Sequence, residues 1–191
     1  MTPPDADGTG RYVVDRIVSR LTVRAFAGGL LSALGHSPTF AVLDYAGEVA
    51  FDPATPSSTL LTVTVRSKSL ALVDDVSQSD RKTIEKTMHE EVLQSATHPE
   101  ISFVSERVAV TPDPGSGRSL QASVRGKLTI RDHTEQVTIP ARVSVTGNLL
   151  RASGEFEIRQ TNFGIKPVMV GGSMLKVKDE LTCTFDLVGK R

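Results

Sequence analysis

Residues 121–158 read QASVRGKLTIRDHTEQVTIPARVSVTGNLLRASGEFEI. Apolar and polar side chains alternate through three runs of this stretch, at 121–130, 137–145 and 150–158. Successive side chains of a β-strand point to opposite faces, so the alternation predicts strands that bury one face. A polar link at 132–135 and the hairpin signal of Gly147 and Asn148 separate the runs. Links this short predict antiparallel pairing, because a parallel pair needs a long crossover.

Similar alternation recurs on both sides of this stretch, at 17–26, 41–51, 60–69, 101–110 and 181–187. Turn-forming residues lie between these runs, with prolines at 53 and 56 and the sequence PDPGSG at 112–117. The pattern therefore predicts about eight strands. Eight strands with one apolar face each can form a two-sheet sandwich or a closed barrel. Periodicity alone leaves both architectures open, and a barrel of this size can be filled by side chains or hold one small ligand.

One segment, 79–94, predicts a helix instead. It lacks glycine and proline, and Ile84, Met88 and Val92 recur every fourth residue on one helical stripe. Ser77 and Asp80 resemble a capping box at its start, and Pro99 ends any continuation. We therefore expect a single amphipathic helix between two strands.

Composition narrows the class of protein. The 191 residues carry 22 basic and 22 acidic side chains, a formal net charge of +0. A chain with no basic excess does not resemble a nucleic-acid-binding protein. The expected organisation is a disordered segment at 1–10 followed by one domain at 11–191. No signal peptide or membrane-spanning segment is evident, so we expect a soluble cytoplasmic protein.

The order of the segments resembles the YceI-like family, which includes polyisoprenoid-binding and lipid-binding proteins, from about Tyr12 to Val188. The similar segments are GGLLSALGH at 28–36, GEVAFDP at 47–53, HPEISFVS at 98–105, VRGKLTI at 124–130, NFGI at 162–165 and VKDEL at 177–181. The resemblance implies an all-β fold, an extended eight-stranded antiparallel lipocalin-like barrel with one inserted amphipathic helix. It also implies an elongated apolar pocket that binds an isoprenoid quinone, a polyprenyl compound or another long-chain lipid, without catalysis.

The expected ligand contacts are mostly aromatic or aliphatic side chains near loops and on strands. They are Phe26, Leu31, His36, Phe40, Phe103, Phe156, Phe163 and Met169. Among them His36 is the candidate donor to a ligand head group. We expect no cofactor apart from a bound isoprenoid or fatty-acid-like lipid. The four histidines lack the short spacing of zinc ligands, so no metal site is predicted. Cys183 falls on the same face of the expected last strand as Leu181, Phe185 and Leu187, which predicts a buried, unreactive thiol.

Two other functions remain open on the sequence. An enzyme acting on a hydrophobic substrate could use His36 or His133 as general base, in which case polar side chains would converge inside the barrel. A stress-related interaction module would have a filled barrel and an exposed apolar patch. A homodimer is compatible with either reading and with lipid binding.

Overall fold

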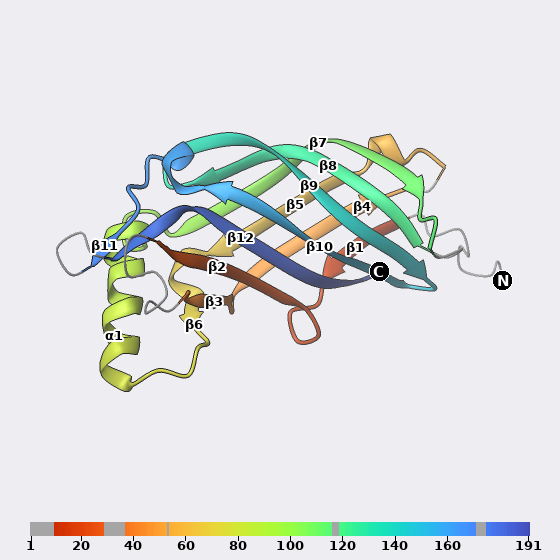
Figure 1. Ribbon diagram of the computed structural model, residues 1–191. Helices are drawn as coiled ribbons and strands as arrows, with labels where there is room; N and C mark the ends of the chain where they lie inside the picture. The colour runs from red at the N-terminus through yellow and green to blue at the C-terminus, as the bar shows by residue number, and fades with distance from the viewer. Residues whose placement is uncertain (1–9, 29–36, 53, 116–118, 171–174) are drawn as a thin grey trace.

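The computed structural model describes residues 10–28, 37–52, 54–115, 119–170 and 175–191. Within these ranges the strands form one antiparallel sheet that curls around a single apolar interior (Figure 1). The strands are β1 (Gly10–Val14), β2 (Arg20–Gly28), β3 (Thr39–Val42), β4 (Tyr45–Phe51), β5 (Leu60–Arg66), β6 (Leu70–Leu72), β7 (Glu100–Pro112), β8 (Ser119–Ile130), β9 (His133–Thr146), β10 (Leu149–Arg159), β11 (Met169–Val170) and β12 (Leu175–Lys190). The helical segments are α1 (Gln78–Thr87), the π-helical turn η4 (Met88–Val92) and the 3-10 turns η2 (Pro56–Ser58), η3 (Ser67–Ser69) and η5 (Gln160–Phe163).

The sheet closes into a barrel. Neighbouring strands follow the order β1-β4-β5-β7-β8-β9-β10-β12, and β12 returns to β1 through the pairs Val13–Lys190 and Val14–Gly189. This ring of eight strands decides between the two architectures that periodicity left open. The expected eight-stranded antiparallel barrel with one inserted helix is confirmed.

The barrel wall is interrupted at three places that the alternation did not predict. The run 41–51 divides at Leu43 and Asp44 into β3 and β4, and the run 60–69 ends in η3, which separates β5 from β6. The two breaks lie side by side, because the Leu43 amide donates to the Ser69 carbonyl at 3.2 Å and the Arg66 amide donates to the Asp44 carbonyl at 2.9 Å. The break between β3 and β4 and the break between β5 and β6 therefore adjoin each other in the barrel wall.

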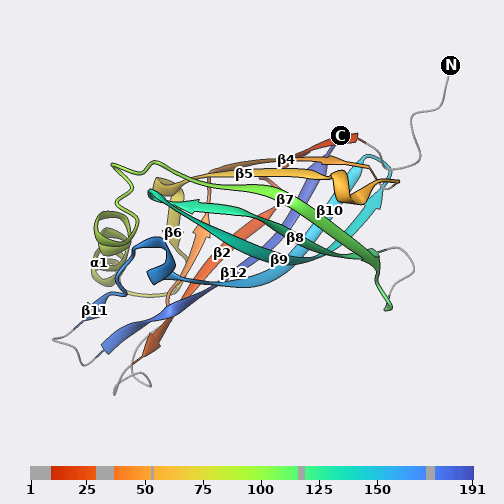
Figure 2. The same cartoon turned by 90° about the horizontal axis from the view of Figure 1, so that it is seen from above.

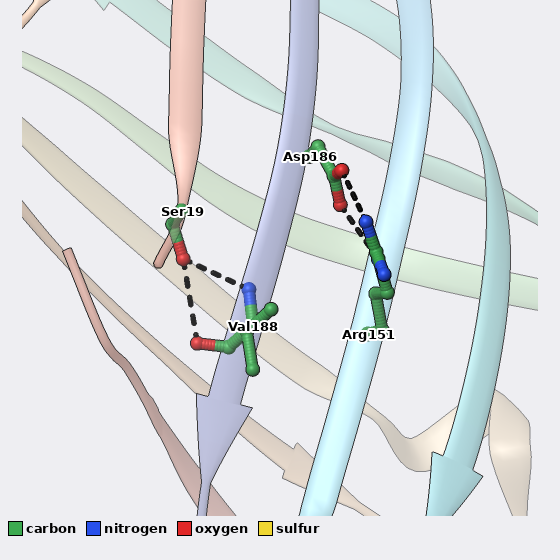
Figure 3. Close-up of polar contacts among 4 residues, drawn as sticks. All are labelled: Ser19, Arg151, Asp186 and Val188. Carbon is green, nitrogen blue, oxygen red and sulfur yellow. Dashed lines mark hydrogen bonds and ion pairs between the residues drawn. The ribbon is translucent and has the colours of Figure 1, made fainter. Parts of the chain in front are cut away.

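The third break separates β1 from β2 and lies where the ring closes. Ser19, in this break, accepts a hydrogen bond from the Val188 amide at 2.9 Å, and its hydroxyl lies 3.5 Å from the Val188 carbonyl (Figure 3). On the other side of β12, Arg151 of β10 makes a two-pronged contact with Asp186 at 2.9 and 2.6 Å. Side chains therefore fasten β12 on both flanks at the closure, where the backbone ladder to β1 is short.

The predicted helix is present with slightly different bounds. The Ser77 hydroxyl accepts from the Asp80 amide at 3.1 Å, which confirms the cap, and the helix runs through α1 and ends in η4. Ile84, Met88 and Val92 pack against the main core, as their spacing predicted. Figures 1 and 2 place α1 at one end of the barrel, between β6 and β7 in the chain.

A second apolar cluster fills the opposite end of the barrel. Tyr12, which is fully buried, packs there with Phe51 and Leu150, and Figure 1 shows β1, the strand of Tyr12, at the end of the barrel away from α1. The interior is thus covered by the helix at one end and filled by this cluster at the other.

Candidate ligand-binding cavity

A cavity of about 190 Å³ lies inside the barrel, between the helical end and the Tyr12 cluster. The inward faces of the strands supply most of its wall, and η4 and η5 supply the rest. The lining side chains are Leu21, Val23, Val42, Leu61, Val63, Val65, Leu70, Val92, Leu93, Ile101, Ser102, Phe103, Leu128, Ile130, Ile139, Phe156, Ile158, Gln160, Phe163, Ile165, Leu181, Cys183, Phe185 and Leu187.

Hydrocarbon dominates this lining. Ser102 and Gln160 are its uncharged polar members, and the Gln160 amide already donates to the Lys178 carbonyl at 2.8 Å. A buried water molecule needs two to four polar partners, and such a wall offers too few of them. An apolar cavity of this kind stays dry and favours an apolar occupant.

Cys183 is the titratable side chain in the lining. Burial raises the pKa of its thiol to about 12, because the thiolate would lose its hydration. The expected burial of Cys183 is confirmed by its 6% exposure. The cavity wall therefore presents no ionised nucleophile or base at neutral pH.

Two glycines on the inward face leave room for aromatic rings. A Cβ placed on Gly126 would be 2.6 Å from the Phe103 ring, and one on Gly154 would be 2.8 Å from the Phe185 ring. Each ring therefore occupies the space that a neighbouring side chain would fill, and lies against the wall of the barrel. Phe185 also packs against Phe156, with ring centroids 6.5 Å apart.

The structure brings three of the sequence-predicted contact residues to the cavity. Phe103, Phe156 and Phe163 line it. Phe40 is buried in the main core but is not part of the lining. Phe26 is partly buried at the end of β2, where the Arg24 guanidinium lies 5.3 Å from its ring centroid.

The remaining predicted contacts lie elsewhere. Met169 in β11 is 63% exposed and does not line the cavity. Leu31 and His36 lie outside the described residues. The choice of aromatic residues missed most of the wall, which is aliphatic. The apolar face of each alternating run was the better predictor of the lining. Leu61, Val63 and Leu128 line the cavity and lie within expected strands.

Of the two histidines proposed as a general base, His133 does not line the cavity, and His36 lies outside the described residues. The ring of His133 packs on Gly164, which has a φ of +66°, and the residue is exposed. Among the described residues, no three His, Cys, Asp or Glu side chains gather as metal ligands do. In the same ranges, no helix has the length and apolar character needed to cross a membrane. The filled barrel of the interaction-module hypothesis is not observed, because the cavity is present.

The sequence of residues 12–189 matches the YceI-like domain family. The chain belongs to the YceI-like family. That match covers every strand of the closed ring except the outer ends of β1 and β12. The resemblance seen in the sequence segments is thereby confirmed. No curated protein sequence matches this YceI-like chain.

Solved structures share the fold of this YceI-like barrel. The crystal structure of Burkholderia cenocepacia BcnA is 24% identical, with a TM-score of 0.69 over 92% of this chain and 98% of that one. A polyisoprenoid binding domain from Saccharophagus degradans, implicated in plant cell wall breakdown, is 11% identical, with a TM-score of 0.65 over 94% and 97%. The Campylobacter jejuni YCEI protein is 15% identical, with a TM-score of 0.55 over 78% and 81%. These likenesses show a common barrel.

Proposed function

We propose that this YceI-like protein binds an amphiphile with an isoprenoid or other long hydrocarbon tail, and holds the tail in the barrel cavity without chemical change. The observation that carries the proposal is the hydrocarbon lining of the cavity, with its two polar side chains and its neutral thiol. The polyisoprenoid binding domain that shares the fold supports the same class of ligand. Family membership supports lipid binding as well.

The energetic basis is the transfer of tail carbons out of water. Each methylene buried contributes about 0.8 kcal/mol before the cost of association is subtracted. An apolar cavity of about 150 Å³ in another protein stays dry and takes up benzene. The cavity of about 190 Å³ therefore accommodates a short apolar segment as it stands. A long tail requires lining side chains such as Phe156 to change rotamer.

The chemistry of the wall supports a non-catalytic role. Catalysis by general acid and base needs a titratable group close to the reacting atom, with a pKa near the working pH. Cys183 is held neutral by burial, and His133 is exposed to solvent and absent from the cavity lining. Binding and release of an unchanged ligand is the function that this lining supports best.

Mass spectrometry of the purified protein tests the proposal. The protein is extracted with organic solvent and the extract is analysed for long-chain compounds. Delipidated protein is then titrated with N-phenylnaphthylamine, whose fluorescence rises in an apolar site. We expect saturable binding of one dye molecule per chain, and competition between the dye and a polyprenol or a long-chain alcohol.

Three outcomes contradict the proposal. The first is delipidated protein that stays folded by circular dichroism and takes up neither dye nor alcohol. The second is turnover, in which the extracted or added compound is recovered chemically altered. The third is a dye that binds without competition from any long-chain compound, because the same apolar lining should bind both the dye and the tail.

A further inference from the structure

The barrel wall between β9 and β10 is paired along only part of its length. Residues 149–153 of β10 pair with residues 142–146 of β9, and the described ladder between the two strands stops there. Beyond that point β9 pairs with β8 alone, and β10 pairs with β12 alone. Pro140, which has no amide hydrogen to donate, lies at the point of separation, since a Cβ on Gly154 would be 2.3 Å from its carbonyl. The two strands therefore form a fork in the wall.

The segment η5 lies at this fork and is fastened on one side. Its Gln160 amide donates to Lys178, and the Thr161 amide and hydroxyl donate to the Asp179 carboxylate at 2.9 and 2.6 Å. All three bonds attach η5 to β12. Among the described residues no hydrogen bond joins η5 to β9, where the contact is the His133 ring on Gly164.

An outer pocket of about 360 Å³ lies over the fork. Its lining comes from both arms of the fork and from η5: Glu135, Gln136, Val137, Thr138, Glu157, Ile158, Arg159, Asn162, Phe163 and Glu180. Two of these side chains, Ile158 and Phe163, also line the inner cavity. They form the partition between the outer pocket and the inner cavity, and Phe163 is only 1% exposed.

Glu135 gives the outer pocket its distinctive chemistry. It pairs across the strands with Leu128, which lines the inner cavity, so the two side chains share the inward face. Glu135 is partly buried. Arg159 is paired with Glu180 at 3.4 Å, and within the described residues neither Glu135 nor Glu157 has an ion-pair partner. The lining of the outer pocket therefore carries the carboxylates of Glu135, Glu157 and Glu180 and one basic side chain, Arg159.

We propose that the fork between β9 and β10 is the opening through which a ligand tail reaches the cavity, and that the outer pocket holds the ligand's head group. Phe163 and Ile158 move aside as the tail passes. Glu135 accepts hydrogen bonds from an uncharged or cationic head group and repels an anionic one. The ligand class is thereby narrowed to alcohols, phenols and amines with apolar tails. This inference rests on the proposed function.

Stopped-flow uptake of N-phenylnaphthylamine tests the opening. Phe163→Ala removes most of the partition, so we expect uptake to quicken about tenfold, the effect of lowering a barrier by roughly 1.4 kcal/mol. Met88→Ala is the matched control, because Met88 is buried in the core at the helical end and does not line the cavity. That control removes a buried side chain without touching the fork. Its uptake rate should stay near that of the unaltered protein.

Two results of the rate comparison would overturn the proposed opening. Faster uptake in Met88→Ala, with no change in Phe163→Ala, would place the opening at the helical end and overturn the fork. Equal acceleration in both variants also overturns it, because the effect would then follow a general loss of core packing. Thermal unfolding is recorded for each variant, and Phe163→Leu replaces Phe163→Ala if the smaller side chain prevents folding.

Competition by three compounds with the same tail tests the head-group pocket. Dodecylamine, dodecanol and dodecanoate each displace the dye, and we expect dodecanoate to be the weakest. Glu135→Gln should reduce the preference for the amine over the carboxylate about fivefold, as expected for one partly exposed charge pair. Glu91→Gln, on the exposed surface of the helix, removes the same charge elsewhere and should leave the preference unchanged.

The outcomes separate the two proposals. If none of the three compounds displaces the dye, the proposed tail-binding function fails. If all three bind and dodecanoate binds as tightly as dodecylamine, the function stands and the head-group inference fails. A preference that is the same in Glu135→Gln and in Glu91→Gln likewise removes Glu135 from the site.

Discussion

The ring of Phe103 lies over the bare Cα of Gly126 on the neighbouring strand. A Cβ at position 126 would be 2.6 Å from that ring and 2.4 Å from the Val104 carbonyl. We expect Gly126→Ala to lower the free energy of unfolding by about 1–3 kcal/mol, the usual cost of overpacking. Gly115→Ala is the control, because its new Cβ would meet only Asp113 at 3.8 Å. Urea unfolding of both variants measures the difference, and equal midpoints would contradict the close approach.

A larger side chain inside the cavity should abolish ligand uptake. Val63 of β5 lines the cavity, so Val63→Phe fills part of the 190 Å³ and should weaken dye binding at least about tenfold with little loss of stability. Val104 on the adjacent strand is 50% exposed and absent from the lining, so Val104→Phe is the matched control. Equilibrium dye titration compares the two variants. Undiminished binding by Val63→Phe places the dye outside the barrel.

The thiol of Cys183 should resist alkylation in the folded protein. With a pKa near 12, about one molecule in ten thousand carries the thiolate at pH 8, and the thiolate is the reactive form. We expect negligible reaction with Ellman's reagent until urea unfolds the chain. The Ser123→Cys variant adds an exposed thiol on β8 and should consume one equivalent rapidly. Similar rates at the two positions would show that Cys183 is not sealed inside.

Acid should weaken the loop between β7 and β8. The buried carboxylate of Asp113 accepts from the Ser119 hydroxyl at 2.8 Å and pairs with Arg142 at 2.9 Å. The hydrogen bond from Ser119 is the main cause of its lowered pKa. A carboxyl whose folded pKa lies below the unfolded value near 3.8 stabilises the fold above that value, and the contribution is lost as the pH falls through the folded pKa.

Asp113→Asn should therefore be less stable than the unaltered protein at neutral pH, and the difference should shrink below pH 4. Urea midpoints measured from neutral pH downward follow this change. Asp75→Asn, at an exposed position before the helix, removes a carboxyl elsewhere on the surface and is the control variant. A gap between Asp113→Asn and the unaltered protein that stays constant across the acid range is incompatible with the proposed titration.

The alternating runs predicted the long strands because each of these strands buries one face. The runs 121–130 and 150–158 lie within β8 and β10, and Gly147, with a φ of +59°, turns the chain between β9 and β10. The interruption at Leu43 and Asp44 was missed, because it depends on a break in the neighbouring strand. The strand β1 was missed too, since Tyr12 and Val13 open a run too short to show alternation.

The cavity was only partly predictable. Inward parity marks Val63 and Leu128 as interior residues, but no pattern in one strand shows how much space remains between opposite walls. That space depends on long-range packing, such as Phe103 against Gly126 and Phe185 against Gly154. The fork between β9 and β10 has the same origin, because the predicted run 137–145 does not show where β9 stops pairing with β10.

The pairing of Val13 with Lys190 has a consequence for biosynthesis. Because β1 leaves the ribosome before β12, the ring cannot close until β12 is made, and until then the edges of β1 and β10 lack their final neighbour. Contacts so distant in sequence are slow to form. The nascent chain therefore passes through a stage in which these strand edges are unpaired and can bind a chaperone. A product truncated before β12 keeps both edges unpaired and is expected to aggregate.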